Sequence, residues 1–455
     1  MRSQDKHENS PVSNISRRQF LRTALGASAA PLVMPASVLG RAGGVAPGNR
    51  ITMGFIGLGG MGTNNLKSFL GIPDAEVVAL CDVNRETTTY GYGHDGTAGW
   101  EPARHIIEQA YGDRAPSGSW KGVAVHRDFR ELLARDDIDA VCICTPDHWH
   151  AAHGVAALRA GKDVYGEKPL TRTIREGRIL TDTVKRYGRV WQTGSFQRSD
   201  ARFIHATELV RNGHIGTVRR VKVGLPANQA CEPKPPEIPP PGLDWDAWLG
   251  PAPWAPYHPW RAFTTWRFIS DYSAGKIADW GAHHLDIAMW GIGMETSGPV
   301  KIKATRCEYP KAGLYDHPTD FEVDFTFASG AVVTLSDAFR RGCEWIGDDG
   351  SVFVSRGTLE TKPGELRRES IAVTEDRVHA HSVSHHQNFI DCVRNRRETA
   401  APVEIAHRTN TGTLLGEIAC RTGRTIRWDP ATETILDDPG AAAMLSRPYR
   451  APWTL

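Results

Sequence analysis

The sequence predicts an α/β fold with two parts: a doubly wound parallel sheet, then an α+β domain with a large, open, mostly antiparallel sheet. From residue 51 to residue 194, apolar runs of strand length alternate with helical periods, as in parallel strands joined by helices. Further on, apolar runs follow one another across short turns, which is typical of antiparallel strands. A chain of 455 residues is long enough for two such domains, which we predict at 49–197 and 198–455.

A glycine-rich turn joins the first predicted strand to the first predicted helix. Gly57, Gly59 and Gly62 have the spacing G-x-G-x-x-G, with Gly60 and Met61 before the last glycine. The first glycine permits a tight turn, the second lets the backbone approach a diphosphate, and the third lets the helix pack on the strand. The helix N-terminus then faces the phosphates. The pattern predicts a Rossmann nucleotide-binding site.

Asp82 ends the second predicted strand, about 20 residues after the last glycine, where an acidic side chain accepts hydrogen bonds from an adenosine ribose. A carboxylate there also repels a 2′-phosphate, so the sequence favours NAD. Arg85 follows closely and could bind a 2′-phosphate, which keeps NADP as the less favoured alternative.

The elements between the ribose position and residue 197 continue the alternation. The apolar run at 140–145, bounded by turn residues, predicts a strand buried on both faces. Thr145, Pro146 and His150 follow its carboxyl end, where open α/β sheets bind ligands. The other expected elements are a long loop at 90–115 with a helix near 102–111, helices at 128–135, 151–160 and 174–187, and a strand at 190–193.

The second half begins with a predicted helix at 201–212 and a strand at 218–223. A segment rich in proline and tryptophan follows at 226–299; its aromatic rings could stack on sugar, pack together, or dock on a neighbouring subunit. Strands are expected at 300–308, 319–328, 331–338, 344–347 and 351–361, and two returning helices at 385–394 and 409–423.

Residues 1–48 resemble an export signal rather than part of the fold. Arg17 and Arg18 are followed by Phe20, Leu21 and a weakly apolar, alanine-rich run, as in twin-arginine signals. The run is too short and interrupted for a membrane span. We therefore expect the twin-arginine export machinery as a partner and a periplasmic or otherwise exported protein; the alternative is a disordered basic tail.

Overall composition argues against a nucleic-acid partner, because 54 basic and 52 acidic residues leave a net charge of only +2. The eight cysteines show no C-x-x-C and no metal-ligand spacing, so most are expected to be buried apolar side chains.

Several motifs together resemble the glucose–fructose oxidoreductase / inositol dehydrogenase (Gfo/Idh/MocA) family over about residues 50 to 430. Besides the glycine turn, these are Thr145-Pro146 with His150, Glu167-Lys168-Pro169, and Gly275-x-x-x-Asp279-x-Gly281-x-His283-x-x-Asp286. The sequences Trp245-Asp-Ala-Trp248-Leu-Gly-Pro251 and Trp428-Asp-Pro430 resemble an exported, carbohydrate-acting subgroup.

The resemblance implies an NAD(P)-binding Rossmann domain, a second domain on a large open sheet, and oxidation or reduction of sugars, sugar derivatives or cyclitols. It also implies that Glu167 and Lys168 lie at the cofactor, with Lys168 beside nicotinamide and substrate, and that Asp279 and His283 stand across the cleft.

Hydride transfer needs one group that moves the hydroxyl proton and another that polarises the oxygen. Asp279 and His283 are four residues apart, so on one helix they share a face, and the carboxylate could orient the imidazole as general base. Lys168 would supply positive charge beside the developing alkoxide. A plain helix-surface pair and a solvated lysine are the structural alternative.

Gln197, Arg198, Trp266 and His284 are the expected substrate contacts, with a structural salt bridge as the alternative for the first two. A metal site of His283 and His284 with Asp279, Asp286 or His386 is disfavoured. Adjacent histidines on a helix point about 100° apart, so one is badly placed for a shared metal.

The leading function is thus an exported NAD-dependent oxidoreductase acting on a hydroxyl or keto carbon of a sugar, glycoside or cyclitol. The alternative is a redox-neutral glycoside hydrolase or lyase that works through a transient keto-sugar. A binding protein on a degenerate scaffold is disfavoured by the intact Lys168, Asp279 and His283. An open sheet face favours a homodimer or homotetramer.

Overall fold

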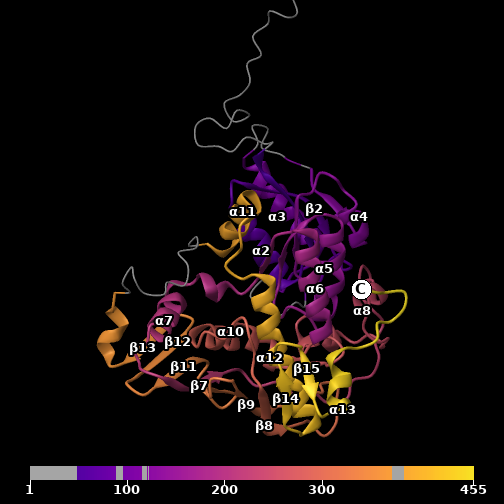
Figure 1. The fold of residues 1–455 in the computed structure, drawn as a ribbon. Coiled ribbons are helices and arrows are strands. Elements are labelled where there is room, and N and C mark those ends of the chain that lie inside the picture. Colours follow the sequence, from indigo (N-terminus) through magenta and orange to yellow (C-terminus); the bar gives the residue numbers. More distant parts are fainter. Residues whose placement is uncertain (1–48, 89–95, 115–119, 121, 371–383) are drawn as a thin grey trace, which may run out of the picture. The chain divides into compact units, whose positions relative to one another are not determined.

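The computed structural model describes residues 49–88, 96–114, 120, 122–370 and 384–455 (Figure 1). The predicted export signal at 1–48 lies outside these residues, as does part of the loop predicted at 90–115. Residues Ile51–Leu455 form one compact unit, built on two sheets.

The first sheet has six parallel strands in the order β3-β2-β1-β4-β5-β6. The chain runs outward from β1 to β3 and then from β4 to β6 on the other side, so the order reverses between β1 and β4. Ligands bind outside the carboxyl ends of the strands at such a point. The strands are β1 (Ile51–Ile56), β2 (Ala75–Cys81), β3 (Ala124–His126), β4 (Ala140–Ile143), β5 (Asp163–Gly166) and β6 (Trp191–Thr193).

Helices cover both faces of this sheet, because successive strand residues point into two different apolar cores. Cys142 belongs to one core, whereas Val141 and Ile143 belong to the other. The first core includes residues of α2 (Gly60–Leu70), α3 (Trp100–Gly112) and α11 (His385–Asn395); the second includes residues of α4 (Phe129–Leu133), α5 (Asp147–Arg159) and α6 (Ile174–Tyr187) (Figure 1).

Helix α6 has the bounds that the sequence predicts, and local chemistry explains both ends. Thr173 Oγ1 accepts a hydrogen bond from Glu176 N at 3.2 Å, and Glu176 Oε2 accepts one from Thr173 N at 2.9 Å. This reciprocal capping box satisfies amides at the helix start. Gly188 ends the helix with a left-handed φ of 59°, which costs glycine little.

The second sheet has nine strands in the order β13-β12-β11-β7-β10-β9-β8-β14-β15. Its β7–β10 pair is parallel, and the other neighbouring pairs are antiparallel. The predicted fold class is therefore confirmed. The strands are β7 (Val218–Gly224), β8 (Lys301–Glu308), β9 (Asp320–Thr326), β10 (Val332–Ser336), β11 (Gly342–Gly347), β12 (Ser351–Ser355), β13 (Thr358–Lys362), β14 (Ile426–Asp429) and β15 (Thr434–Leu436).

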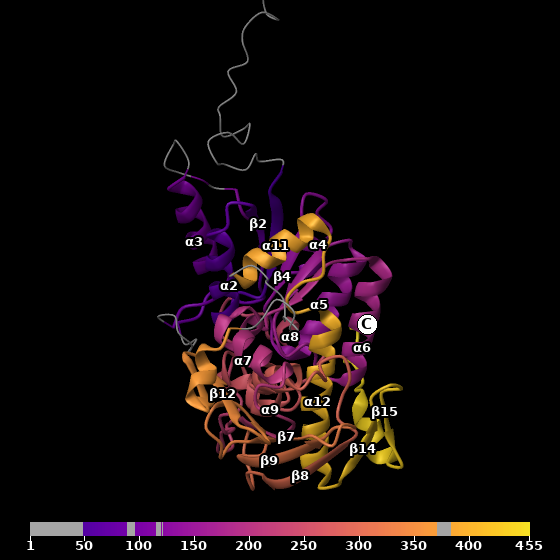
Figure 2. The same cartoon turned by 60° about the vertical axis from the view of Figure 1, so that its left-hand side comes forward.

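An apolar core joins this sheet to the helices on one of its faces, with α9 and α12 above β7, β8 and β9 in Figure 2. A disulfide between Cys307 and Cys420, which the sequence analysis does not foresee, joins β8 to α12. The helices are α7 (Ala201–Arg211), α9 (Gly275–Asp279), α10 (Gly281–Gly291) and α12 (Val403–Thr422); η2 (Phe196–Ser199), η5 (Gly364–Arg368), α13 (Pro439–Ala442) and η6 (Ala443–Leu445) are short.

The tryptophan-rich segment forms an apolar cluster of its own. It contains α8 (Trp245–Leu249), η3 (Pro259–Arg261) and η4 (Thr265–Phe268). The rings of Trp245 and Trp248 stack with centroids 4.7 Å apart, while Trp254 is 67% exposed. Packing within this cluster therefore explains the placement of most of these rings. Only a ring that reaches a cavity could stack on a sugar.

Three predicted elements differ from the structure. Helix α12 begins at Val403, not at 409, and Pro402 stands at its N-cap. Helix α5 begins at Asp147, not near 151, because Pro146 already stands at its N-cap. The run at 351–361 is not one strand: Arg356 and Gly357 turn the chain, and β12 pairs with β13 as a hairpin. Gly357 has a φ of +87°, which this tight turn requires. No helix among the described residues is long and apolar enough to cross a membrane.

Candidate active site

The glycine turn after β1 has no room for side chains at two of its predicted positions. Gly57 has a φ of +90°, and a Cβ there would lie 2.8 Å from the backbone of Cys144 and Thr145. A Cβ on Gly62 would lie 2.1 Å from the carbonyl oxygen of Gly57. Gly60 and Met61 form the first turn of α2. The turn, helix and β4 are therefore pressed together, as a dinucleotide-binding turn requires.

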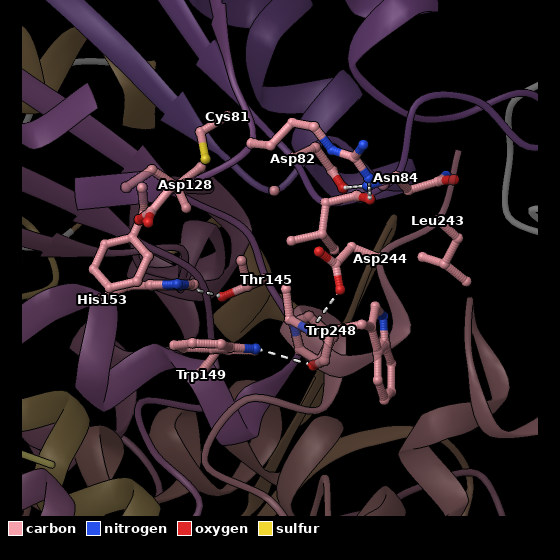
Figure 3. A pocket seen from close by; sticks show the side chains of 18 of the residues that line it. Cys81, Asp82, Asn84, Asp128, Thr145, Trp149, His153, Leu243, Asp244 and Trp248 are labelled. Carbon is pink, nitrogen blue, oxygen red and sulfur yellow. Dashed lines mark hydrogen bonds between the residues drawn. The ribbon is translucent and has the colours of Figure 1, made fainter. Parts of the chain in front are cut away.

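A cavity of about 360 Å³ opens at this turn. Of the predicted cofactor residues, it is lined by Gly57, Gly59, Asp82, Thr145 and Pro146. Figure 3 shows Asp82 and Asn84 at one end of the view and Trp149 and Trp248 at the other. Trp149 Nε1 donates to the carbonyl oxygen of Trp248 at 3.0 Å, which ties α5 to the tryptophan-rich segment.

The carboxylate of Asp82 already accepts hydrogen bonds from the backbone. Its Oδ2 accepts a hydrogen bond from Leu58 N at 2.6 Å, and its Oδ1 accepts one from Asn84 N at 2.8 Å. Burial raises the pKa of Asp82 to about 6, although these backbone hydrogen bonds oppose the shift. Each carboxylate oxygen keeps a second lone pair, so Asp82 can still accept from a ribose.

Arg85, the residue behind the NADP alternative, does not line this cavity. Its guanidinium lies 5.8 Å from the ring centroid of Trp100 and its Nε lies 3.9 Å from Glu101. Arg127 does line the cavity, with its Nη2 3.4 Å from the carbonyl oxygens of Val83 and Gly242.

Glu167 and His150, both predicted at the cofactor, do not line this cavity. Asn65 Nδ2 on α2 donates to Glu167 Oε1 at 2.8 Å, and burial raises the pKa of this carboxyl. His150 Nδ1 lies 2.7 Å from the Pro169 carbonyl oxygen, and its Nε2 lies 2.8 Å from that of Thr145. Glu167 thus connects the segment after β5 to α2, and His150 connects the segments that follow β4 and β5.

Lys168 and Asp279 meet, although 111 residues separate them. Lys168 Nζ donates to Asp279 Oδ1 at 2.7 Å and to its carbonyl oxygen at 3.0 Å. Lys276 Nζ donates to Oδ2 at 2.8 Å, and Arg267 Nε lies 3.5 Å from Oδ1. Burial alone would raise the pKa of Asp279, but these three cations hold it well below its usual range.

The predicted orientation of His283 by Asp279 is not seen as a hydrogen bond among the described residues. Asp279 ends α9, His283 belongs to α10, and the helix is interrupted at Trp280 between them. Within the described residues, Nδ1 of His283 is buried without a hydrogen-bond partner. Burial, then the charge of Lys168, lower the pKa of His283 well below its ordinary value, so the ring is uncharged at neutral pH.

The structure separates the predicted substrate contacts. For Arg198 it shows the salt bridge that the sequence analysis gives as the alternative, because the side chain is buried and forms two 2.7 Å hydrogen bonds with Asp286. Trp266 lines the cavity, and the neighbouring Arg267 reaches Asp279. Gln197 and His284 are buried, and both polar atoms of each side chain have no partner among the described residues.

The residues of the metal alternative are separated in the structure. Asp286 is held by Arg198, while His386 Nε2 lies 2.9 Å from Asn65 Oδ1. In the described part of the chain, no three His, Cys, Asp or Glu side chains are grouped to hold a metal ion.

Two halves of the chain match one family. Residues 51–195 match the NAD-binding Rossmann fold of the Gfo/Idh/MocA oxidoreductase family, and residues 228–455 match its C-terminal alpha/beta domain. The chain belongs to the Gfo/Idh/MocA oxidoreductase family. The predicted resemblance is therefore confirmed at the level of the family, while the exported subgroup stays a prediction.

Relatives and solved structures extend this finding. An alpha-N-acetylgalactosaminidase of Shewanella oneidensis is 31% identical over 191 residues, which are 38% of this chain and 38% of that protein, so the alignment spans well under half of the relative. The aldose-aldose oxidoreductase from Caulobacter crescentus, complexed with glycerol, has a TM-score of 0.57 at 20% identity and covers 83% of this chain and 99% of its own.

The WlbA dehydrogenase from Bordetella pertussis, in complex with NADH and UDP-GlcNAcA, has a TM-score of 0.57 at 16% identity and covers 84% of this chain and 99% of its own. At such identities these solved structures establish a shared Gfo/Idh/MocA fold.

The residues at the cavity fit the NAD that this family's Rossmann domain binds. The turn admits only glycine at Gly57, and Gly59, which lines the cavity, is the N-cap of α2. Amides at a helix start suit a diphosphate, and Asp82 suits a ribose. Gly57, Gly59, Asp82, Thr145 and Pro146 would hold the nucleotide.

Sequence reasoning missed several residues of this Gfo/Idh/MocA site. Lys276 precedes Asp279 by three positions, a spacing at which helix neighbours pair, so it could have been found. Arg267, Asn65 and Trp453 come to the site from distant segments, and no local pattern marks them.

Proposed function

We propose that the protein is an exported NAD-dependent oxidoreductase that transfers a hydride between nicotinamide and a hydroxyl or keto carbon of a sugar, glycoside or cyclitol. The observation that carries this proposal is the pair of Lys168 and Asp279, which fixes an ammonium group near the uncharged imidazole of His283. The names of the sugar-acting proteins that share the fold support the substrate class.

Bound NAD supplies the hydride acceptor. His283 takes the proton of the reacting hydroxyl, which it can do because its ring is uncharged. Lys168 stabilises negative charge on the substrate oxygen, and Asp279 positions Lys168. As that oxygen becomes negative it offsets the nearby cation, so His283 becomes a stronger base while the reaction proceeds.

The likeness to an alpha-N-acetylgalactosaminidase favours a second candidate, redox-neutral cleavage of a glycoside. With NAD as the hydride acceptor, a sugar hydroxyl would first be oxidised to a ketone while His283 takes its proton. The ketone acidifies the neighbouring C–H bond, so loss of that proton and of the glycosidic group would leave an unsaturated ketone. For hydrolysis water would then add to the double bond, and in either case the hydride would return to the ketone. Such a cycle needs no supply of free nucleotide, which suits an exported enzyme.

The fate of the nucleotide separates the two candidates. Purified protein would be mixed with NAD and a panel of sugars and aryl glycosides, and absorbance at 340 nm followed together with aglycone release. Sustained growth of NADH identifies net oxidation; aglycone release with constant or transient NADH identifies redox-neutral cleavage. A complete panel with neither signal, in protein that binds NAD, would contradict both.

Export through the twin-arginine route is part of the proposal, and it rests on Arg17 and Arg18. The disulfide between Cys307 and Cys420 suits an oxidising compartment. Arg17→Lys combined with Arg18→Lys should leave folded protein in the cytoplasm. Equal recovery of variant and wild type from the periplasm would refute the export signal.

We also propose a homodimer or homotetramer, from the open face of the second sheet. Light scattering of the purified protein should give a mass two or four times that of the chain, and a monomer would refute it.

A further inference from the structure

The sheet order assigns the two ends of the nucleotide cavity. The glycine turn follows the central strand β1, and Lys168 follows β5 on one side. A diphosphate at the turn and nicotinamide near Lys168 leave the adenosine to extend toward β2 and β3. The cavity walls there include Asp82 after β2 and Phe129 after β3.

The C-terminal segment 447–455 reaches this adenosine end and is anchored there. Arg447 Nη1 donates to the carbonyl oxygen of Asp271 at 2.7 Å. Arg450 Nη1 donates to Asp246 Oδ1 at 2.6 Å, and its Nε donates to the Gly250 carbonyl oxygen at 2.9 Å. These contacts tie the segment to the tryptophan-rich part of the chain, which also lines the cavity.

Trp453 is the residue of this segment that lines the cavity. Its ring packs edge-on against Trp149 with centroids 4.7 Å apart, and it lies 5.5 Å from the guanidinium of Arg130. Its Nε1 is buried and has no hydrogen-bond partner among the described residues. The indole N–H therefore faces the surrounding protein, and the aromatic ring is the part of Trp453 that lies at a wall of the cavity.

We propose that Trp453 is an adenine-contacting residue and that segment 447–455 holds the adenosine half of NAD in place. This inference rests on the proposed function, since it takes NAD as the ligand. An aromatic ring at the wall of the cavity can stack on a purine. Because Trp453 stands at the wall of the cavity, its contact with adenine slows the release of the nucleotide.

The test is the release rate of bound NADH, measured by fluorescence after dilution into excess NAD, together with the dissociation constants of ADP-ribose and nicotinamide mononucleotide. Trp453→Ala should release NADH roughly 5- to 100-fold faster, the range for losing one stacked base. The same variant should raise the dissociation constant of ADP-ribose by a similar factor and leave that of nicotinamide mononucleotide unchanged. Trp453→Phe should retain most of the affinity, because it keeps a ring.

Trp254→Ala is the matched control, since that tryptophan is 67% exposed and does not line the cavity. Equal release from Trp453→Ala, Trp254→Ala and wild type would overturn the inference and leave the proposed function intact. Equal weakening of ADP-ribose and nicotinamide mononucleotide would also overturn it, because Trp453 would then support the whole fold. Wild type that binds neither NAD nor NADH would refute inference and proposed function together.

Discussion

At the scale of single residues, the chemistry of the site depends on carboxylates whose burial and partners differ. Asp82 has a raised pKa because the cost of burying its charge outweighs the backbone hydrogen bonds that oppose the shift. Asp279 has a lowered pKa because three cations outweigh its burial. The first therefore titrates near neutral pH, whereas the second stays ionised there.

The raised pKa of Asp82, about 6, predicts pH-dependent binding of NAD. Above this value the carboxylate is ionised and accepts from the ribose; below it, a proton occupies one of the oxygens. The affinity for NAD should therefore fall roughly tenfold between pH 7 and pH 5, as follows from one pH unit below the pKa. Calorimetry at both pH values checks this, and Asp82→Asn should bind NAD with little pH dependence. A pH-independent affinity in wild type would contradict it.

Removing the negative charge of Asp279 leaves Lys168, Lys276 and Arg267 close together without their shared partner. Asp279→Asn should lower the free energy of unfolding by about 3 kcal/mol, as for a broken buried ion pair. Urea unfolding measures this. Asp137→Asn is the surface control, because that carboxylate is 64% exposed. Equal midpoints for Asp279→Asn and the control would refute this account of Asp279.

At the scale of elements, the Arg198–Asp286 pair fastens η2 to α10, the helix that carries His283. Both side chains are 3% exposed, so either single substitution leaves a buried charge without its ionic partner. Arg198→Ala and Asp286→Ala should each cost about 3 to 5 kcal/mol, and the double variant much less than their sum. Urea midpoints provide the double-mutant cycle. Arg340→Ala is the surface control, because that side chain is 57% exposed. Additive effects, or a midpoint near that of the control, would show that the pair does not anchor α10.

Local patterns were sufficient for most elements but not for the geometry of the site. The capping box at Thr173 and the left-handed Gly188 fix α6 in the sequence itself. The break at Trp280 has no such local mark, so an unbroken helix was the natural expectation for Asp279 and His283. The role of Arg198, substrate contact or salt bridge, also could not be predicted from local sequence, because its partner Asp286 lies 88 residues away.

At the scale of the whole molecule, the site is assembled from the ends of the first sheet and helices over the second. The motifs that resemble the family imply Lys168 at the cofactor and Asp279 across the cleft. The structure adds that the two side chains form a direct ion pair. Other contacts near the site join residues that are distant in the sequence. The hydrogen bond from Asn65 to Glu167, for example, depends on how α2 packs against β5. Tertiary packing of this kind leaves no periodicity in the sequence.

The central claim is that Lys168 and His283 carry out the proton and charge work of hydride transfer. Its most direct test is the rate of the first turnover at 340 nm in protein loaded with equal amounts of NAD, mixed with a substrate found in the glycoside panel. His283→Ala should slow this step by roughly two to four orders of magnitude with nucleotide occupancy unchanged. Lys168→Met should slow this step and weaken the binding of substrate. The double variant should be little slower than the slower of the two single variants. His105→Ala, at a histidine 65% exposed on α3, should match wild type. A first turnover near the wild-type rate in His283→Ala, with substrate and cofactor saturating, would contradict the claim.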